Sequence, residues 1–178
     1  DIIIYNKNGV YSTGKIYVYE GKIVNEFFTV DTDTRYILQS ENVDTNSIKV
    51  TVINSDTDSS NTVYSYKDSL LGLNSSSEVY FLQGYKSNQY EVVFGDGVSG
   101  KKLINGNIVK ITYRSTNGEL GNRVSSFNTT RKIEEKYDVT VTTNIIATDG
   151  SEREDTESIK FYAPRHFTTQ NRAVTKED

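Results

Sequence analysis

The stretch "VVFGDGVSGKKLINGNIVKITYR", residues 92–114, decides how the fold is read. It places Asp96 between two glycines after one apolar run, and a second apolar run follows an Asn-Gly pair. A phosphate loop would need a helix after its glycines and the spacing G-x-x-x-x-G-K-S/T, and both features are absent here. A calcium loop would need further oxygen ligands at alternating positions, and Asp96 stands alone. The stretch therefore predicts two strands joined by turns, with nothing bound.

Six residues of this stretch are predicted to shape turns. Glycine allows positive φ, aspartate bonds its own backbone two residues on, and Asn-Gly is typical of type I′ hairpin turns. The predicted turn residues are Gly95, Asp96, Gly97, Gly100, Asn105 and Gly106. This pattern indicates hairpin connections between the flanking strands.

Outward from this stretch, apolar and polar residues alternate as they do in half-buried strands. Ile48, Val50 and Val52 fall on one face of a long strand that follows an Asn/Asp/Thr turn. Polar breaks lie at 56–61 and 71–78. The strand-bearing segments are 14–31 (a hairpin turning at Glu20-Gly21), 35–55, 78–85 and 89–95 (flanking a Lys-Ser-Asn loop), 107–114 and 137–148.

The C-terminal segment is predicted to hold one short helix. Ser151 and Glu154 have the spacing of a capping box, and Ile159 and Tyr162 share a helical face with the next alanine. Pro164 is expected to end this helix, because the residue before proline is pushed out of the α region. The final "TKED" resembles the start of another helix, so the natural chain is expected to continue.

These patterns predict a mainly β fold of antiparallel sheets, a sandwich or a meander, with one short helix near the C-terminus. Three regions are expected. Residues 1–74 form an N-terminal β region, 75–148 a β region with the FGDGV signature, and 149–178 a helix and connector to a further C-terminal part.

Composition excludes several classes of protein. The net charge of -4 gives no basic excess for nucleic acid or an anionic membrane. The absence of cysteine excludes disulfides, thiolate zinc sites and cysteine nucleophiles. No apolar run is long enough to span a membrane, and the N-terminus has no signal-peptide pattern. With 13 tyrosines among many Val, Ile and Thr residues, the chain has the composition of pleated, half-exposed surfaces.

No catalytic or metal-binding set emerges. His166 is the one histidine and lacks a G-x-S-x-G elbow as partner. The Asp31/Asp33 and Asp56/Asp58 pairs lie in Thr/Ser-rich loops typical of solvated turns. The sequence therefore predicts a non-enzyme without cofactor or metal. Two alternatives stay open, a carbohydrate-binding or adhesin β-sandwich with exposed tyrosines, and a hydrolase built on two of the acidic residues Glu134, Glu135, Glu152, Glu154 and Glu157.

Two stretches resemble a known family. "VVFGDGVSGKKLINGNIVKITYRSTNGELGN" (92–122) resembles the FGDGV pattern of phage baseplate J-like proteins and of the large baseplate wedge subunit of T-even-type contractile tails. "EDTESIKFYAPRHFTTQNRAVTKED" (154–178) is similar to a junction in the same family. Leu103 or Ile104 stands where many members have proline.

The resemblance implies a structural virion protein of the tail baseplate, assembled in the host cytoplasm, that binds neither nucleic acid nor membrane. Its expected partners are other wedge proteins and copies of itself, with a homodimer in the intact protein. They form a ring around the central hub that rearranges when the sheath contracts. Arginines beside planar amides suit multidentate contacts. The candidate interface residues are Arg165, His166, Phe167, Gln170, Asn171 and Arg172.

Overall fold

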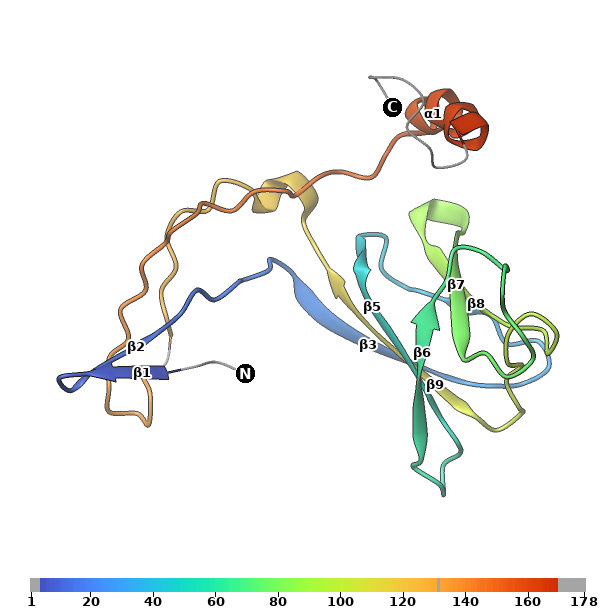
Figure 1. Ribbon diagram of the computed structural model, residues 1–178, viewed down its shortest axis with the longest axis horizontal. Helices are drawn as coiled ribbons and strands as arrows, with labels where there is room; N and C mark the ends of the chain where they lie inside the picture. Colours follow the sequence, from blue (N-terminus) through green and yellow to red (C-terminus); the bar gives the residue numbers. More distant parts are fainter. Residues whose placement is uncertain (1–3, 131, 170–178) are drawn as a thin grey trace. The chain divides into compact units, whose positions relative to one another are not determined.

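The computed structural model describes residues 4–130 and 132–169 of the 178-residue chain (Figure 1). The chain divides into two compact units, Asp1–Asn117 and Gly118–Asp178. The described residues are mainly β, with antiparallel-rich sheets and one short helix near the C-terminus, so the predicted fold class is confirmed.

The described strands all lie in the first unit. They are β1 (Ile4–Lys7), β2 (Val10–Thr13), β3 (Lys22–Thr29), β4 (Tyr36–Ile37), β5 (Val43–Ile53), β6 (Asn61–Tyr66), β7 (Val79–Gly84), β8 (Tyr90–Phe94) and β9 (Ile108–Ser115). A short 3-10 turn, η1 (Lys86–Asn88), joins β7 to β8. β1 and β2 form a two-stranded sheet, and the others form a seven-stranded sheet in the order β3-β9-β5-β6-β7-β8-β4.

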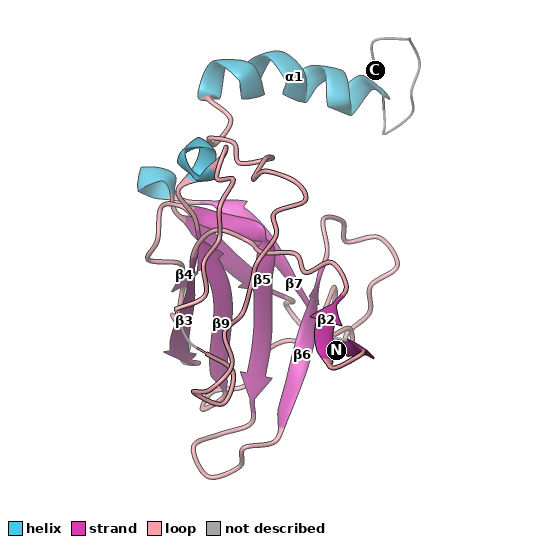
Figure 2. Cartoon of the chain, turned by 90° about the vertical axis from the view of Figure 1, so that its left-hand side faces the viewer, coloured by secondary structure: helices cyan, strands magenta, loops and turns pink. Residues whose placement is uncertain are grey.

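Within the larger sheet every neighbouring pair is antiparallel except β6 and β7, which run parallel. A parallel pair needs a crossover connection, and residues 67–78 supply it. Figure 2 shows β3, β9, β5 and β6 side by side as one layer. β7, β8 and β4 form a second layer, and the parallel β6–β7 pair connects the two layers.

The two layers enclose one hydrophobic core. Phe28 on β3 and Tyr36 on β4, the two edge strands, meet edge to face with ring centroids 5.6 Å apart. Phe94 on β8 continues this arrangement at 5.0 Å from Tyr36 and 5.5 Å from Tyr64 on β6. Because side chains from the two ends of the strand order touch, the sheet folds over on itself as a sandwich does.

The strand periodicity places the core residues. Val109, Ile111 and Tyr113 on β9 are at most 1% exposed, whereas the alternate residues point outward. Each fully buried aliphatic side chain contributes about 1.5–3 kcal/mol. On β5, Val50 and Val52 are buried and Ile48 packs against the core, as the alternation predicts.

Two predicted strands are absent, and three strands, β1, β2 and β6, were not predicted. Residues 14–20 of the expected 14–31 hairpin are not in a strand, and 137–148 contributes one isolated bridge, Ile133 to Tyr137. Alternation gives a strand only where a neighbouring strand supplies ladder hydrogen bonds, and these segments have no such neighbour among the described residues. Conversely, β6 begins at Asn61, directly after the predicted polar loop.

The hairpin expected across residues 92–114 is wrong. β8 pairs with β7 and β4, and β9 pairs with β3 and β5, so β8 and β9 are not partners. Residues 95–107 instead cross from one layer to the other. Gly106 has a φ of +90° while Asn105 does not have a positive φ, so this turn is not the expected type I′.

The expected boundary between residues 74 and 75 runs through the seven-stranded sheet, because β6 precedes it and β7 pairs directly with β6. The first compact unit instead ends at Asn117.

The second unit contains η2 (Gly118–Gly121) and the helix α1 (Thr156–Thr169). Asp155 caps the helix by accepting the Ser158 N–H at 2.8 Å, in place of the predicted Ser151 box. Pro164 lies inside α1 and does not end it, since a proline removes one helical hydrogen bond without preventing continuation. No helix within 4–130 and 132–169 is both long and apolar enough to span a membrane.

Candidate functional site

The FGDG loop after β8 is held by its own aspartate. Asp96 Oδ1 accepts the backbone N–H groups of Val98 and Ser99, each at 2.8 Å. These bonds, that of Ser99 foremost, lower the pKa of the Asp96 carboxyl below its usual value. The loop is closed further by the Gly97 N–H, which donates to the Gly100 carbonyl at 3.0 Å. The carboxylate of the motif is therefore directed into its own loop.

Two glycines of the motif allow a backbone contact that no other residue would permit. A Cβ on Gly95 would lie 2.2 Å from the Gly100 carbonyl carbon. Gly100 has a φ of +105°, and its Cβ would lie 3.1 Å from Val79 on β7. The loop doubles back on itself so closely that a side chain at position 95 or 100 would clash with neighbouring atoms, so both positions need glycine.

The crossover loop between β6 and β7 fastens the motif from outside. Gly100 N–H donates to the Asn74 carbonyl at 3.0 Å, and Lys101 N–H donates to the Ser77 carbonyl at 2.8 Å. Lys101 Nζ also pairs with Glu78 at 2.8 Å. The motif thus joins residues 95–107, which connect β8 to β9, to residues 67–78, which connect β6 to β7.

A polar pocket of about 250 Å³ lies beside this junction. Its lining combines two lysines with amides, hydroxyls and a few apolar side chains. The lining residues are Val52, Asn54, Ser60, Asn61, Thr62, Tyr64, Lys101, Lys102, Ile104 and Asn107. Both ends of the Asn107 side-chain amide are hydrogen-bonded. Its NH2 group donates to the Asn54 carbonyl, and its oxygen accepts a hydrogen bond from the Ile104 N–H, each at 2.9 Å.

The paired aspartates belong to turns. Asp31 accepts the Thr32 N–H at 2.6 Å. Asp58 accepts the Asn54 amide at 2.6 Å and the Ser60 N–H at 3.0 Å, and these bonds lower its pKa to about 2. Within the described ranges no group of three or more metal-ligating side chains occurs.

Sequence reasoning did not find an ion pair between a buried carboxylate, that of Glu91, and a half-exposed arginine, Arg35. Glu91 on β8 is 5% exposed and receives both Arg35 Nε (2.8 Å) and Arg35 Nη2 (2.6 Å). Gln83 on β7 donates to the same carboxylate at 2.9 Å. The hydrogen bonds from Arg35 are the main cause of a lowered Glu91 pKa. Since the partners are 56 positions apart, no local pattern reveals this contact.

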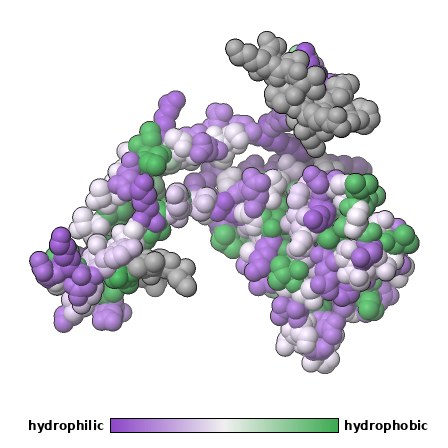
Figure 3. Space-filling model, viewed as in Figure 1, coloured by the Kyte–Doolittle hydropathy of each residue, from purple (hydrophilic) through white to green (hydrophobic). Residues whose placement is uncertain are grey.

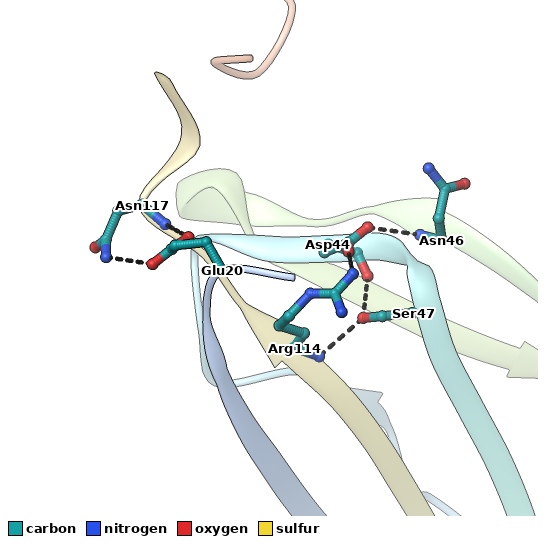
Figure 4. A network of polar contacts seen from close by, with 6 residues as sticks. All are labelled: Glu20, Asp44, Asn46, Ser47, Arg114 and Asn117. Carbon is teal, nitrogen blue, oxygen red and sulfur yellow. Dashed lines mark hydrogen bonds and ion pairs between the residues drawn. The ribbon is translucent and has the colours of Figure 1, made fainter. Parts of the chain in front are cut away.

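A second polar network closes the end of the β3-β9-β5 layer (Figure 4). Arg114 on β9 pairs with Asp44 on β5, and its backbone N–H donates to Ser47 Oγ at 2.8 Å. Glu20 accepts both the backbone N–H (3.0 Å) and the side-chain amide (2.7 Å) of Asn117. The chain entering β3 and the chain leaving β9 are therefore fastened together.

A third network lies under β3. Tyr113 is 1% exposed, and its hydroxyl donates to Glu26 Oε1. The same oxygen accepts the Gln39 N–H at 2.9 Å. Burial first, and then the Glu26 contact, raise the pKa of Tyr113 to about 12. The Tyr113 hydroxyl and the Gln39 N–H are both satisfied by Glu26 Oε1, which gives this group a structural role.

The candidate interface residues are only partly described. Arg165 is exposed on α1, with its guanidinium carbon 4.0 Å from the centroid of the Phe161 ring. His166 and Phe167 lie in the last turns of the helix. Gln170, Asn171 and Arg172 lie outside the described residues.

Three of the five acidic residues of the hydrolase alternative each make a separate local contact. Glu152 accepts the Glu119 N–H at 3.3 Å, Glu154 accepts the Ser158 hydroxyl at 2.6 Å, and Glu157 lies 3.4 Å from Lys160. Each of these contacts is local to the second unit and solvent-exposed, which favours a structural role for these carboxylates.

No protein-family model matches the chain, and a search of curated proteins returned no match. The fold and its loops define a mainly β module whose motif residues bind the backbone of their own chain.

Proposed function

We propose that the chain is a structural part of a phage tail baseplate wedge, which acts by protein–protein contact in the ring around the hub. The motif that carries the resemblance supports this proposal. Gly95, Asp96 and Gly100 lie in one tightly folded loop, in which Asp96 Oδ1 and the N–H and carbonyl of Gly100 are hydrogen-bonded within the first unit. A motif that specifies the connection between two layers is expected in a scaffold, whereas a ligand-binding loop would leave donors or acceptors directed outward.

Exposed apolar surface gives further support for an assembly role. Isoleucine, valine and tyrosine side chains along residues 4–19 are 54–78% exposed. Figure 3 shows hydrophobic residues at the surface among hydrophilic ones. Many exposed apolar side chains within one short segment make that segment a candidate surface for another protein to cover.

The proposal is tested in virions. Antibodies against this chain should label the tail end of particles of the phage that encodes it, and mass spectrometry should find the chain in purified particles. The intact protein should also associate with itself or with other baseplate proteins. A protein that stays monomeric and is absent from particles would overturn the proposal.

One observation favours a second candidate, carbohydrate binding. Tyr5, Tyr11, Tyr17 and Tyr19 are 56–78% exposed, and exposed aromatic rings can stack on sugars. Against it, the one aromatic side chain that lines the polar pocket is Tyr64, which is 4% exposed. A glycan array with the intact chain separates the two functions.

A further inference from the structure

The seven-stranded sheet has two edges of very different length. One edge is β4, which has two residues, and the other is β3, which has eight. β3 pairs with β9 along its whole length, from Lys22–Ser115 to Thr29–Ile108, and no described strand pairs with its other side. Such an edge presents unpaired backbone donors and acceptors to any further strand.

β3 is not short, and it lacks two further features that keep edges from pairing. It contains no proline, and its ladder with β9 has no bulge, unlike the β5–β9 ladder, which is irregular between Asp44 and Lys49. Its outward side chains include Ile23 and Phe27, which are 59% and 61% exposed. A long, regular and partly apolar edge is a template for strand addition.

The charges on β3 favour a second β3 as the added strand. Lys22 and Glu26 lie on the same side of the strand, with Val24 between them. In an antiparallel register centred on Val24, each Lys22 lies opposite Glu26 of the other copy, and the two Val24 side chains face each other. A register centred on Glu26 would place two carboxylates opposite each other, and opposed like charges destabilise a strand pair.

The Lys22 ammonium and the Glu26 carboxylate are both able to form this ion pair between two copies. The two hydrogen bonds to the Glu26 carboxylate end on Oε1, which leaves Oε2 to a lysine. Lys22 is in no ion pair within the described part of the chain. The one side-chain bond to the β3 backbone, from Thr34 to the Thr29 carbonyl, lies at the far end of the strand.

We propose that β3 is the docking edge for a second copy of this chain, joined antiparallel about a two-fold axis at Val24. Two copies then share one continuous layer, β6-β5-β9-β3-β3-β9-β5-β6, with a Lys22–Glu26 pair on each side of the axis. This inference deepens the proposed assembly function and rests on it for the kind of partner. One strand pair buries less area than the interface of a stable dimer, so we expect a weak affinity and dimers only at high protein concentration.

The test measures self-association by sedimentation velocity over a range of protein concentrations. The wild-type chain should dimerise as concentration rises. Lys22→Glu places like charges opposite each other at both pairs and should weaken dimerisation about tenfold. Lys49→Glu is the matched control, since it makes the same charge change on β5, away from the edge, and should leave dimerisation unchanged.

A charge exchange gives a sharper result. The Lys22→Glu and Glu26→Lys variants should each dimerise poorly alone, and an equal mixture should dimerise like wild type, because both pairs are then complementary. Should Glu26→Lys fail to fold, hydrogen exchange on the wild type replaces it, and β3 amides should gain protection as concentration rises.

Three outcomes overturn the inference. In the first, the wild-type chain remains monomeric at every concentration. In the second, the Lys22→Glu variant dimerises as well as wild type. In the third, the wild-type chain never self-associates, but substitutions in β3 abolish its assembly with another baseplate protein. The last outcome would assign the edge to a strand from another protein. The proposed function fails separately, if the chain is absent from particles even though β3-dependent dimers form in solution.

Discussion

Single residues hold this β module together through contacts that span long stretches of sequence. The Asp96 carboxylate bonds the backbone of its own loop, as the sequence predicts. Glu26 and Tyr113 contact each other across 87 positions, and nothing in the local sequence of either residue predicts this. At this scale, turn chemistry is predictable from sequence and buried polar contacts are not.

Gly95 gives the most direct test of the motif loop. Gly95→Ala should destabilise the protein by about 2–3 kcal/mol, because the added methyl group would overlap the Gly100 backbone, which cannot move aside as a side chain could. The measurement is urea unfolding. Gly14→Ala is the control, since a Cβ there meets no atom within 4 Å and its effect should be close to zero. Equal stabilities for the two variants would contradict the loop geometry.

Tyr113 should make stability depend on alkaline pH. A pKa raised from 10.0 to about 12 means that the fold favours the neutral phenol. Its contribution of about 2 kcal/mol is complete below the unfolded pKa and is lost as pH rises toward the folded value. Tyr113→Phe should flatten the fall in stability over this range, measured by denaturant unfolding at a series of pH values.

The control for this variant is Tyr17→Phe, because Tyr17 is 78% exposed. It should leave both the neutral stability and the alkaline dependence unchanged. If the two variants gave the same pH profile, Tyr113 would not be the group responsible.

At the scale of elements, strand alternation predicted β5, β7, β8 and β9 well because their neighbours in the sheet complete the pattern. The same alternation in residues 14–20 and 137–148 gave no strand, which shows that pairing and not periodicity decides. Pairing also explains the hairpin that was wrongly expected, since β9 lies between β3 and β5 rather than beside β8. Likewise, Pro164 did not end α1, because the signal that proline gives is local and a helix can tolerate it.

The ion pair of Glu91 joins three elements, the chain before β4, β8 and β7. Glu91→Gln should lower the free energy of unfolding by about 1–2 kcal/mol at neutral pH, since it removes the charge that Arg35 contacts twice. The Glu91 pKa is lowered in the fold, so its contribution is present above the unfolded value and is lost as pH falls through the folded value. Acid unfolding of the variant should therefore be less steep than that of wild type.

Glu78→Gln is the matched control, because the Glu78 side chain is 39% exposed whereas that of Glu91 is 7% exposed. Exposed pairs contribute about 0–1 kcal/mol, so this variant should stay close to wild type. An acid profile for Glu91→Gln that coincides with that of wild type would show that the buried carboxylate does not set the dependence.

At the scale of the whole molecule, the hydrophobic core formed by the described residues lies within the first unit. Every residue of the core cluster lies between Val24 and Tyr113, and every strand ends at or before Ser115. A chain truncated after Asn117 should therefore unfold in one cooperative transition, with a Tm within a few degrees of the intact protein.

A shorter chain, truncated after Gly106, should not fold. It lacks β9, which pairs with both β3 and β5 and contributes three of the most buried side chains. Circular dichroism during thermal unfolding measures both, and a broad or absent transition in the longer piece would mean that the first unit depends on residues 118–178.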